Sequence, residues 1–174
     1  MKTAVSLALL LLVVNLITPV PALGQAARAE FRNAQGEPLG TATLSDDPEG
    51  VMIRLQLSKL PPGTHGLHIH AVGRCDPPDF TSAGGHFNPE VRKHGLQNPD
   101  GAHTGDLPNL TVTGNGSANV ELLARDVLLG SATNSHSLFP PTGTSLVIHA
   151  NADDGKTDPA GNAGARIACG VITR

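Results

Sequence analysis

The side chains with the greatest chemical potential in this sequence are the histidines, most of which are crowded between residues 65 and 103. His68 and His70 occupy alternate positions of the segment GLHIH. Alternate residues of a β-strand share one face, so both imidazoles project together while Leu67 and Ile69 face the core. Such a pair can converge on one metal ion, although an isolated pair of this kind is as readily two solvated strand histidines.

Two further regions carry groups that bind metals. His149 ends another apolar strand and is a third candidate ligand. A glycine-rich loop contributes His86, His94, His103 and Asp106. Three histidines and one aspartate can fill a tetrahedral site of the kind that zinc occupies, and imidazole-rich sites also suit copper. A polar loop without a ligand would have little need for so much histidine, so the sequence predicts a metal centre.

Short alternating segments between turn residues must position these groups, and no strong amphipathic helix is evident. In residues 51–58, for example, Val51, Ile53, Leu55 and Leu57 share one face. We expect strands at residues 27–33, 39–44, 51–58, 66–71, 109–113, 117–122, 145–150 and 165–172. Eight short strands without helices predict an all-β antiparallel sandwich or barrel.

The segments that connect the expected strands differ widely in length. Gly114-Asn115-Gly116, between two expected strands, predicts a β-hairpin. Two long connections, residues 72–108 and 125–143, contain many glycines and prolines. Ordered loops of this length are uncommon unless they have a function. The first of them carries most of the candidate ligands.

The N-terminal residues and the composition restrict the class of protein. A basic start, a short apolar run and small residues at its exit predict a signal peptide over residues 1–24. An uncleaved anchor is the alternative, but the run falls short of the ~20 apolar residues that a span needs. Residues 25–174 then suit one domain. The net charge of −3 argues against nucleic acid and anionic membranes as partners. Cys75 and Cys169, an even count in an exported chain, favour a disulfide over two free thiols.

Five motifs, in this order along the chain, resemble those of the copper–zinc superoxide dismutase family: GLHIH, GGHFNP, KHG, HTGDLPN and GNAGARIACGVI. Together they extend over nearly all of residues 25–174 and are highly specific. The resemblance implies an eight-stranded antiparallel Greek-key β-barrel with long metal-bearing loops. It also implies copper and zinc as cofactors and an exported, periplasmic or secreted protein of the bacterial type. It leaves open whether the protein forms a homodimer.

The same resemblance assigns roles to individual residues. The copper ligands would be His68, His70, His86 and His149. The zinc ligands would be His86, His94, His103 and Asp106. Asp153 would link a copper-ligand histidine to a zinc-ligand histidine, Cys75 and Cys169 would form the intrasubunit disulfide, and Arg166 would lie beside the copper. His65 and His136 have no expected part in the chemistry.

The activity implied by the resemblance is conversion of superoxide to oxygen and hydrogen peroxide through Cu(II)/Cu(I) cycling. His86, the shared imidazolate, would take up and release a proton. Because the substrate is an anion and the protein is net negative, a local positive field must attract it. Arg166 is the principal candidate, with Lys156 and Lys93 as further candidates for substrate steering. Two alternatives are a non-catalytic copper chaperone or metal-storage protein of the same fold, and a zinc-only hydrolase or lyase.

Overall fold

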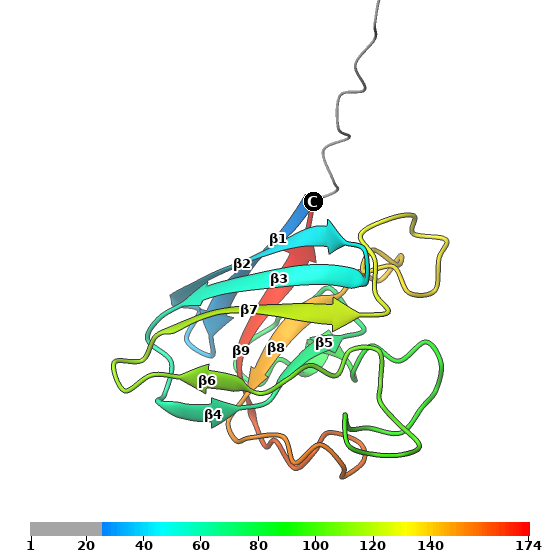
Figure 1. Cartoon of the computed structure of the whole chain (residues 1–174). Coiled ribbons are helices and arrows are strands. Elements are labelled where there is room, and N and C mark those ends of the chain that lie inside the picture. Colours follow the sequence, from blue (N-terminus) through cyan, green and yellow to red (C-terminus); the bar gives the residue numbers. More distant parts are fainter. Residues whose placement is uncertain (1–25) are drawn as a thin grey trace, which may run out of the picture.

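A computed structural model describes residues 26–174 and contains little regular structure other than β-strands (Figure 1). Within this range the only helical element is a 3₁₀ turn, η1 (Thr81–Ala83). None of the described residues belongs to a helix long and apolar enough to cross a membrane. The predicted signal peptide, residues 1–24, lies outside the described residues.

The described residues form nine strands, and the predicted all-β fold class is confirmed. They are β1 (Ala26–Asn33), β2 (Pro38–Asp47), β3 (Gly50–Leu57), β4 (Gly63–His65), β5 (Leu67–His70), β6 (Leu110–Val112), β7 (Ala118–Arg125), β8 (Ser145–His149) and β9 (Arg166–Thr173). The strand added to the predicted eight is β4, which only Gly66 separates from β5. A Cβ atom at Gly66 would meet the Cβ of Ala163 at 2.9 Å. Gly66 is therefore a position that another segment approaches too closely to leave room for a side chain.

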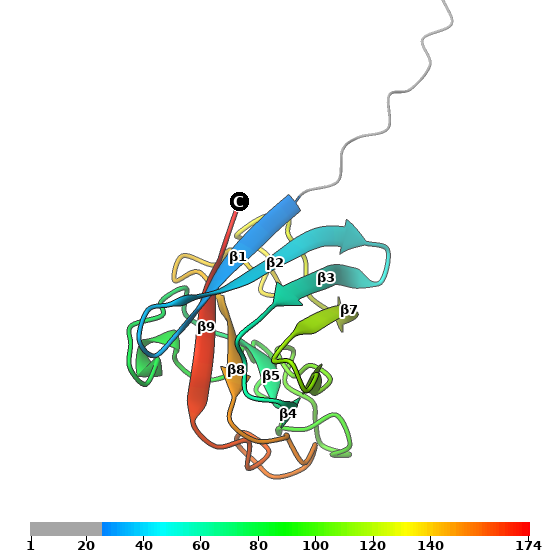
Figure 2. The same ribbon diagram turned by 90° about the vertical axis from the view of Figure 1, so that its left-hand side faces the viewer.

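Seven strands make one antiparallel sheet in the order β5-β8-β9-β1-β2-β3-β7, and β4 pairs with β6 in a second, small sheet. The large sheet curls into a barrel, and β4 and β6 lie along the side left open between β7 and β5 (Figures 1 and 2). The chain leaves β3 near one edge of the large sheet and returns at β5 on the opposite edge. This long crossing is the Greek-key connection.

The predicted hairpin at residues 114–116 is only partly correct. The turn exists, because the Thr113 N–H donates to the Ser117 carbonyl oxygen at 2.9 Å. The strands on its two sides do not form a ladder with each other, however, since β6 pairs with β4 and β7 pairs with β3. A local turn signal determines the reversal of the chain, whereas the barrel determines which strand edges are free to pair.

The barrel core follows the alternation predicted for β3, in which Val51, Ile53 and Leu55 are fully buried. Phe31 of β1 is also fully buried and packs with them in one core cluster. β5 differs, because both of its faces are buried, including the face that carries His68 and His70. The long loops cover that outer face and remove the histidines from bulk water.

Two long loops come together at one end of the barrel (Figure 1). The loop of residues 71–109 bonds to the loop of residues 150–165 where the Gln97 N–H donates to the Gly155 carbonyl oxygen at 2.9 Å. The His94 N–H donates to Asp158 Oδ1 at 2.7 Å. These bonds join the segments that carry most of the predicted ligands to the segment between β8 and β9.

Candidate metal centre

Four imidazoles from three parts of the fold converge on one point. β5 supplies His68 and His70, β8 supplies His149, and the loop after β5 supplies His86. One ring nitrogen of each lies within 4.8 Å of the corresponding nitrogen of every other member. We call these four residues the four-histidine group. The structure thus brings together all of the side chains that the sequence predicted as copper ligands.

Each member of the four-histidine group has one buried ring nitrogen without a hydrogen-bond partner: His68 Nδ1, His70 Nε2, His86 Nε2 and His149 Nε2. Buried polar atoms are seldom left unpaired, because a lost hydrogen bond to water is not compensated. Four such nitrogens that converge within 4.8 Å of one another have the arrangement of a metal site. The donor set suits copper, which accepts imidazole nitrogens readily.

The opposite ring nitrogens of the three strand histidines are all hydrogen-bonded. His68 Nε2 donates to Asp153 Oδ2 at 2.7 Å, His70 Nδ1 to the Gly84 carbonyl oxygen at 2.9 Å, and His149 Nδ1 to the Gly164 carbonyl oxygen at 3.1 Å. An acceptor at one nitrogen fixes the proton there and leaves a lone pair on the other. The tautomers are therefore set so that the three unpartnered nitrogens can bind a cation.

A second group shares His86 with the first and contains His94, His103 and Asp106. Asp106 Oδ1 lies 2.8 Å from His86 Nδ1, 3.0 Å from His94 Nδ1 and 3.3 Å from His103 Nδ1. A tetrahedral zinc site with bonds of about 2.0–2.1 Å has ligand separations of about 3.3 Å. We call these four residues the Asp106 group, and its dimensions match a tetrahedral site.

Asp153 connects the two groups from outside. Its Oδ2 atom lies 2.7 Å from Nε2 of His68 and 3.0 Å from Nε2 of His94. The Gly155 N–H donates to Asp153 Oδ1 at 2.6 Å, and the Asp153 N–H donates to Asn109 Oδ1 at 2.9 Å. The carboxylate is thus held between a histidine of each group, as the sequence predicted.

Burial determines the charge state of three members of the four-histidine group. It lowers the pKa of His70 to about 2 and the pKa values of His86 and His149 to about 4, with the neighbouring histidines contributing to each shift. The pKa of Asp106 lies well below its usual range despite burial, because His103, His86 and His94 bond to the carboxylate. At neutral pH these imidazoles are neutral and the carboxylate is charged, which are the forms that bind metal ions.

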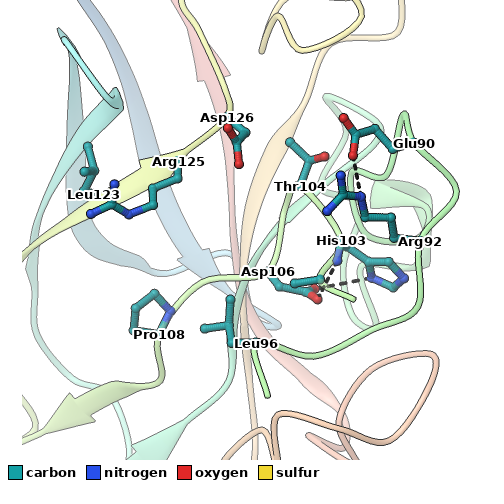
Figure 3. Close-up of a pocket in the computed structure, with 11 residues that line it drawn as sticks. Glu90, Arg92, Leu96, His103, Thr104, Asp106, Pro108, Leu123, Arg125 and Asp126 are labelled. Atoms are coloured by element: carbon teal, nitrogen blue, oxygen red, sulfur yellow. Dashed lines mark hydrogen bonds and ion pairs between the residues drawn. The ribbon is translucent and has the colours of Figure 1, made fainter. Parts of the chain in front are cut away.

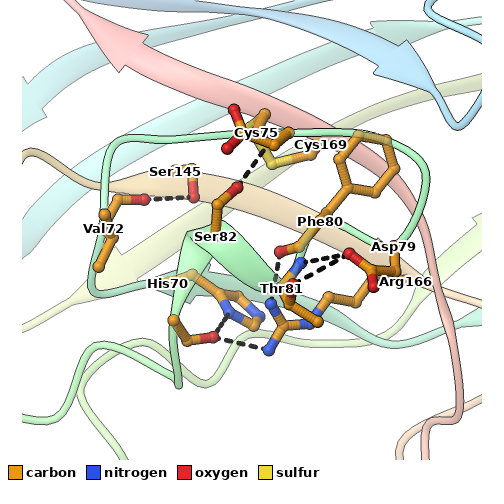
Figure 4. The surroundings of a disulfide bond; sticks show 12 residues. His70, Val72, Cys75, Asp79, Phe80, Thr81, Ser82, Ser145, Arg166 and Cys169 are labelled. Atoms are coloured by element: carbon orange, nitrogen blue, oxygen red, sulfur yellow. Dashed lines mark hydrogen bonds between the residues drawn. A yellow bond between two sulfur atoms is a disulfide. The ribbon is translucent and has the colours of Figure 1, made fainter.

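Arg166 opens β9 next to the four-histidine group. Its Nη1 donates to the Phe80 carbonyl oxygen and its Nη2 donates to the Gly84 carbonyl oxygen, both at 2.6 Å. The same Gly84 oxygen accepts from His70 Nδ1, so one carbonyl joins the arginine to a predicted copper ligand (Figure 4). Burial lowers the pKa of Arg166, and the charge of Asp79 partly offsets this effect.

A disulfide joins Cys75 to Cys169, and this prediction is confirmed. It attaches the loop that carries Phe80 and Gly84 to β9, the strand that begins at Arg166 (Figure 4). The disulfide therefore connects the loop that accepts the Arg166 hydrogen bonds to the strand that carries Arg166.

A cavity of about 400 Å³ lies on the outer side of the Asp106 group (Figure 3). His103 and Asp106 contribute to its wall, together with Arg92, Leu96 and Arg125. None of the four unpartnered ring nitrogens belongs to a residue that lines this cavity.

The remaining predicted residues lie outside the two groups. His65 is buried, with one ring nitrogen 2.8 Å from the His149 carbonyl oxygen and the other 2.9 Å from the Pro61 carbonyl oxygen. His136 is half-buried and lies 3.4 Å from Glu90.

Neither lysine considered for steering belongs to a ligand group. Lys93 is exposed and lies 3.6 Å from Asp158, and Lys156 is exposed on the loop between β8 and β9.

Sequence reasoning missed three groups that organise the site. Asp158 accepts the His94 N–H, and the carbonyl oxygens of Phe80 and Gly84 hold Arg166. A carbonyl oxygen is present in every residue, so no residue type marks its role. Only the Asp158 side chain offered a signal, as a carboxylate in the loop after His149, and nothing in the sequence gave its partner.

Comparison with known proteins agrees with this geometry. The family model described as copper/zinc superoxide dismutase matches residues 39–172. A "Superoxide dismutase [Cu-Zn] 1" of Aquifex aeolicus is 51% identical over 145 residues, which cover 83% of this chain and 85% of that protein. The "Superoxide dismutase [Cu-Zn]" of Caulobacter vibrioides is 43% identical over 148 residues, which cover 84% and 85% of the two chains. The chain belongs to the copper–zinc superoxide dismutase family.

Solved structures lead to the same family. A superoxide dismutase-like protein from Bacillus subtilis superposes with a TM-score of 0.80 at 40% identity, over 83% of this chain and 96% of that one. The Cu/Zn superoxide dismutase of Brucella abortus gives 0.68 at 30% identity, over 86% and 100%. This superoxide dismutase is accordingly an oxidoreductase with the Greek-key barrel of its family, whose name implies copper and zinc.

Proposed function

We propose that this dismutase binds copper in the four-histidine group and zinc in the Asp106 group, and that superoxide is converted to oxygen and hydrogen peroxide at the copper side. The four unpartnered, buried imidazole nitrogens carry this proposal. When bound, copper supplies the one-electron redox couple, while zinc contributes charge without redox change. Two superoxide ions and two protons then give one oxygen and one hydrogen peroxide.

His86 is the proposed proton carrier of the reaction. Its Nε2 faces the four-histidine group and its Nδ1 lies 2.8 Å from Asp106 Oδ1, inside the other group. The ring can therefore hold a proton at Nε2 on the substrate side while Nδ1 remains engaged. Release of that proton to the reduced oxygen species would supply one of the two protons of hydrogen peroxide.

Arg166 is the proposed substrate-positioning residue. Its guanidinium is permanently charged at neutral pH, and two carbonyl oxygens fix its direction. A small anion that approaches the four-histidine group meets this charge at the entrance. The fork of N–H donors suits a diatomic anion, which can accept from the guanidinium edge.

The cellular setting is also part of the proposal. The predicted signal peptide and the Cys75–Cys169 disulfide support export to an oxidising compartment, the periplasm or the exterior. A homodimer is a further prediction, which sedimentation analysis of the purified mature protein would test.

Elemental analysis and activity measured on the same preparation test the proposed function. We expect one copper and one zinc per chain, and dismutation that rises in proportion to copper content. Full copper content without activity would indicate the alternative of a copper chaperone or store. Zinc without copper would favour a zinc-only enzyme.

A further inference from the structure

Arg166 lines a hollow of about 390 Å³, and the carbonyl oxygen of Gly164 in the same lining accepts a hydrogen bond from His149 Nδ1 at 3.1 Å. The hollow is bounded on one side by the start of β9 and the residues before it, and on the other by the loop after Cys75. Its lining residues are Pro78, Asp79, Thr81, Gly164, Ala165 and Arg166. Two of these side chains carry a charge, and the charges have opposite sign.

The second charge, Asp79, is fixed in place although it is exposed. Its Oδ1 accepts the Thr81 N–H at 3.1 Å and the Thr81 hydroxyl at 3.0 Å. The next residue, Phe80, uses its carbonyl oxygen to hold Arg166. Asp79 is therefore carried on the same short segment that anchors the arginine (Figure 4).

Asp79 and Arg166 act on each other through space. The Thr81 hydrogen bonds are the main reason that the pKa of Asp79 is lowered, and the charge of Arg166 adds to this effect. Within residues 26–174 no ion pair or hydrogen bond joins the two side chains. The carboxylate thus weakens the field of the guanidinium without occupying its donors.

We propose that Asp79 is a specificity-determining residue at the substrate entrance, where its negative charge weakens anion capture by Arg166 and discriminates against multiply charged anions. This inference rests on the proposed function. Repulsion from a fixed charge scales with the charge of the approaching ion, so an inorganic dianion is disfavoured by the square of the factor that applies to superoxide. The charge of Asp79 therefore slows the capture of superoxide somewhat and weakens the binding of inorganic phosphate at the copper side more strongly.

The Asp79→Asn variant tests this proposal, because asparagine keeps the acceptor oxygen for Thr81 and removes only the charge. Both the variant and the parent are compared as holoenzymes of verified copper and zinc content. At low ionic strength we expect kcat/KM for superoxide to rise by about two- to threefold. The gain should disappear toward 1 M salt, where the screening length is about 3 Å.

Binding of two inorganic anions gives a readout independent of turnover. Calorimetric titration of the Asp79→Asn holoenzyme should show azide binding about two- to threefold more tightly and hydrogen phosphate about four- to ninefold more tightly. Glu121→Gln is the control, since it removes the same charge from β7, away from the hollow, and should change neither affinity.

Several outcomes would overturn the proposal. A slower Asp79→Asn enzyme would mean that the carboxylate positions Arg166, and an unchanged rate would mean that its charge is without effect. A phosphate gain no larger than the azide gain would remove the discrimination. Absence of dismutation by the parent holoenzyme would instead contradict the proposed function itself.

Discussion

His86 lies in both ligand groups, and Asp153 connects the same two groups from outside through His68 and His94. A carboxylate that accepts from two imidazoles fixes both tautomers at once, because its two oxygens provide several acceptor positions. One side-chain amide oxygen cannot replace it fully, since the amide nitrogen is a donor. At the scale of single residues, the site therefore depends on a carboxylate that lies outside both the four-histidine group and the Asp106 group.

We expect Asp153→Asn to weaken the affinity for both metals by about 10- to 100-fold, the range observed when outer carboxylate partners are removed. Competition with a chromophoric chelator at neutral pH would measure each dissociation constant. Asp100→Asn, which changes an exposed carboxylate outside both groups, is the matched control. A loss confined to one metal would show that Asp153 does not couple the groups.

Arg166→Ile removes the positive charge and both bonds to the loop carbonyls. We expect kcat/KM for superoxide to fall by about tenfold at low ionic strength, because electrostatic attraction of the anion is lost. Copper content should not change, since no ligand is touched. Metal analysis beside the kinetic assay checks both statements, and an unchanged rate would remove Arg166 from substrate capture.

At the scale of elements, the Cys75–Cys169 disulfide is the link between the barrel and the loop of residues 71–109. It closes a segment of 94 residues and so restricts the unfolded chain. The chain-entropy model assigns a loop of this size about 4–5 kcal/mol. The same bond holds the segment whose carbonyl oxygens orient Arg166.

Reduction of this disulfide in the metal-free protein should lower Tm by about 8–20 °C, using the usual shift of about 2–4 °C per kcal/mol for a chain of this size. Differential scanning calorimetry would measure the shift. The doubly substituted Cys75→Ser, Cys169→Ser protein should match the reduced protein. Equal melting of oxidised and reduced forms would mean that the loop stays attached without the bond.

At the scale of the whole molecule, one end of the barrel contains several buried titratable groups, and their pKa values are shifted in opposite directions. In the metal-free protein the folded pKa values of His70, His86 and His149 lie below the ordinary value of 6.5. The unfolded chain therefore binds more protons than the folded chain as pH falls below 6.5, which favours unfolding. Burial also acts on His94, but Asp106 and Asp153 raise its pKa to about 9, so its stabilisation persists below pH 6.5 and is lost as pH rises through 9.

Asp106 and Asp153 do not offset the loss of stability that the three histidines cause between pH 6.5 and 4. The pKa values of Asp106 and Asp153 are both held well below their usual range despite burial, the first by bonds from His103, His86 and His94 and the second mainly by the bond from His68. Their stabilisation is present above about pH 4 and is lost only below it. The three histidines therefore dominate between pH 6.5 and 4.

We expect the metal-free protein to lose roughly several kcal/mol of unfolding free energy as pH falls from 6.5 to 4, up to about 1.4 kcal/mol per pH unit for each of the three histidines. Urea denaturation at a series of pH values would measure the slope. His136→Asn, a change outside both groups, should leave the slope as it is. A stability that stays constant over this range would contradict the neutral, buried state of the histidines.

Local patterns in the sequence were sufficient for the strand positions, the buried face of β3 and the family. These features depend on alternation and on motif order, which are properties of neighbouring residues. The eight expected strands all occur, and the added β4 (Gly63–His65) lies directly before the one expected at residues 66–71. The residues expected as ligands could be named because histidine and aspartate are chemically distinctive.

Only the folded chain decided the relations between distant segments. The pairing of β6 with β4 depends on which strand edge the barrel leaves free. The choice of Nδ1 in His68 but Nε2 in His70 and His149 depends on acceptors from the loops at residues 84, 153 and 164. The role proposed for the charge of Asp79 depends on its interaction with Arg166, which lies 87 residues later in the sequence. These are long-range contacts between backbone and side-chain atoms, and a one-dimensional pattern does not encode their geometry.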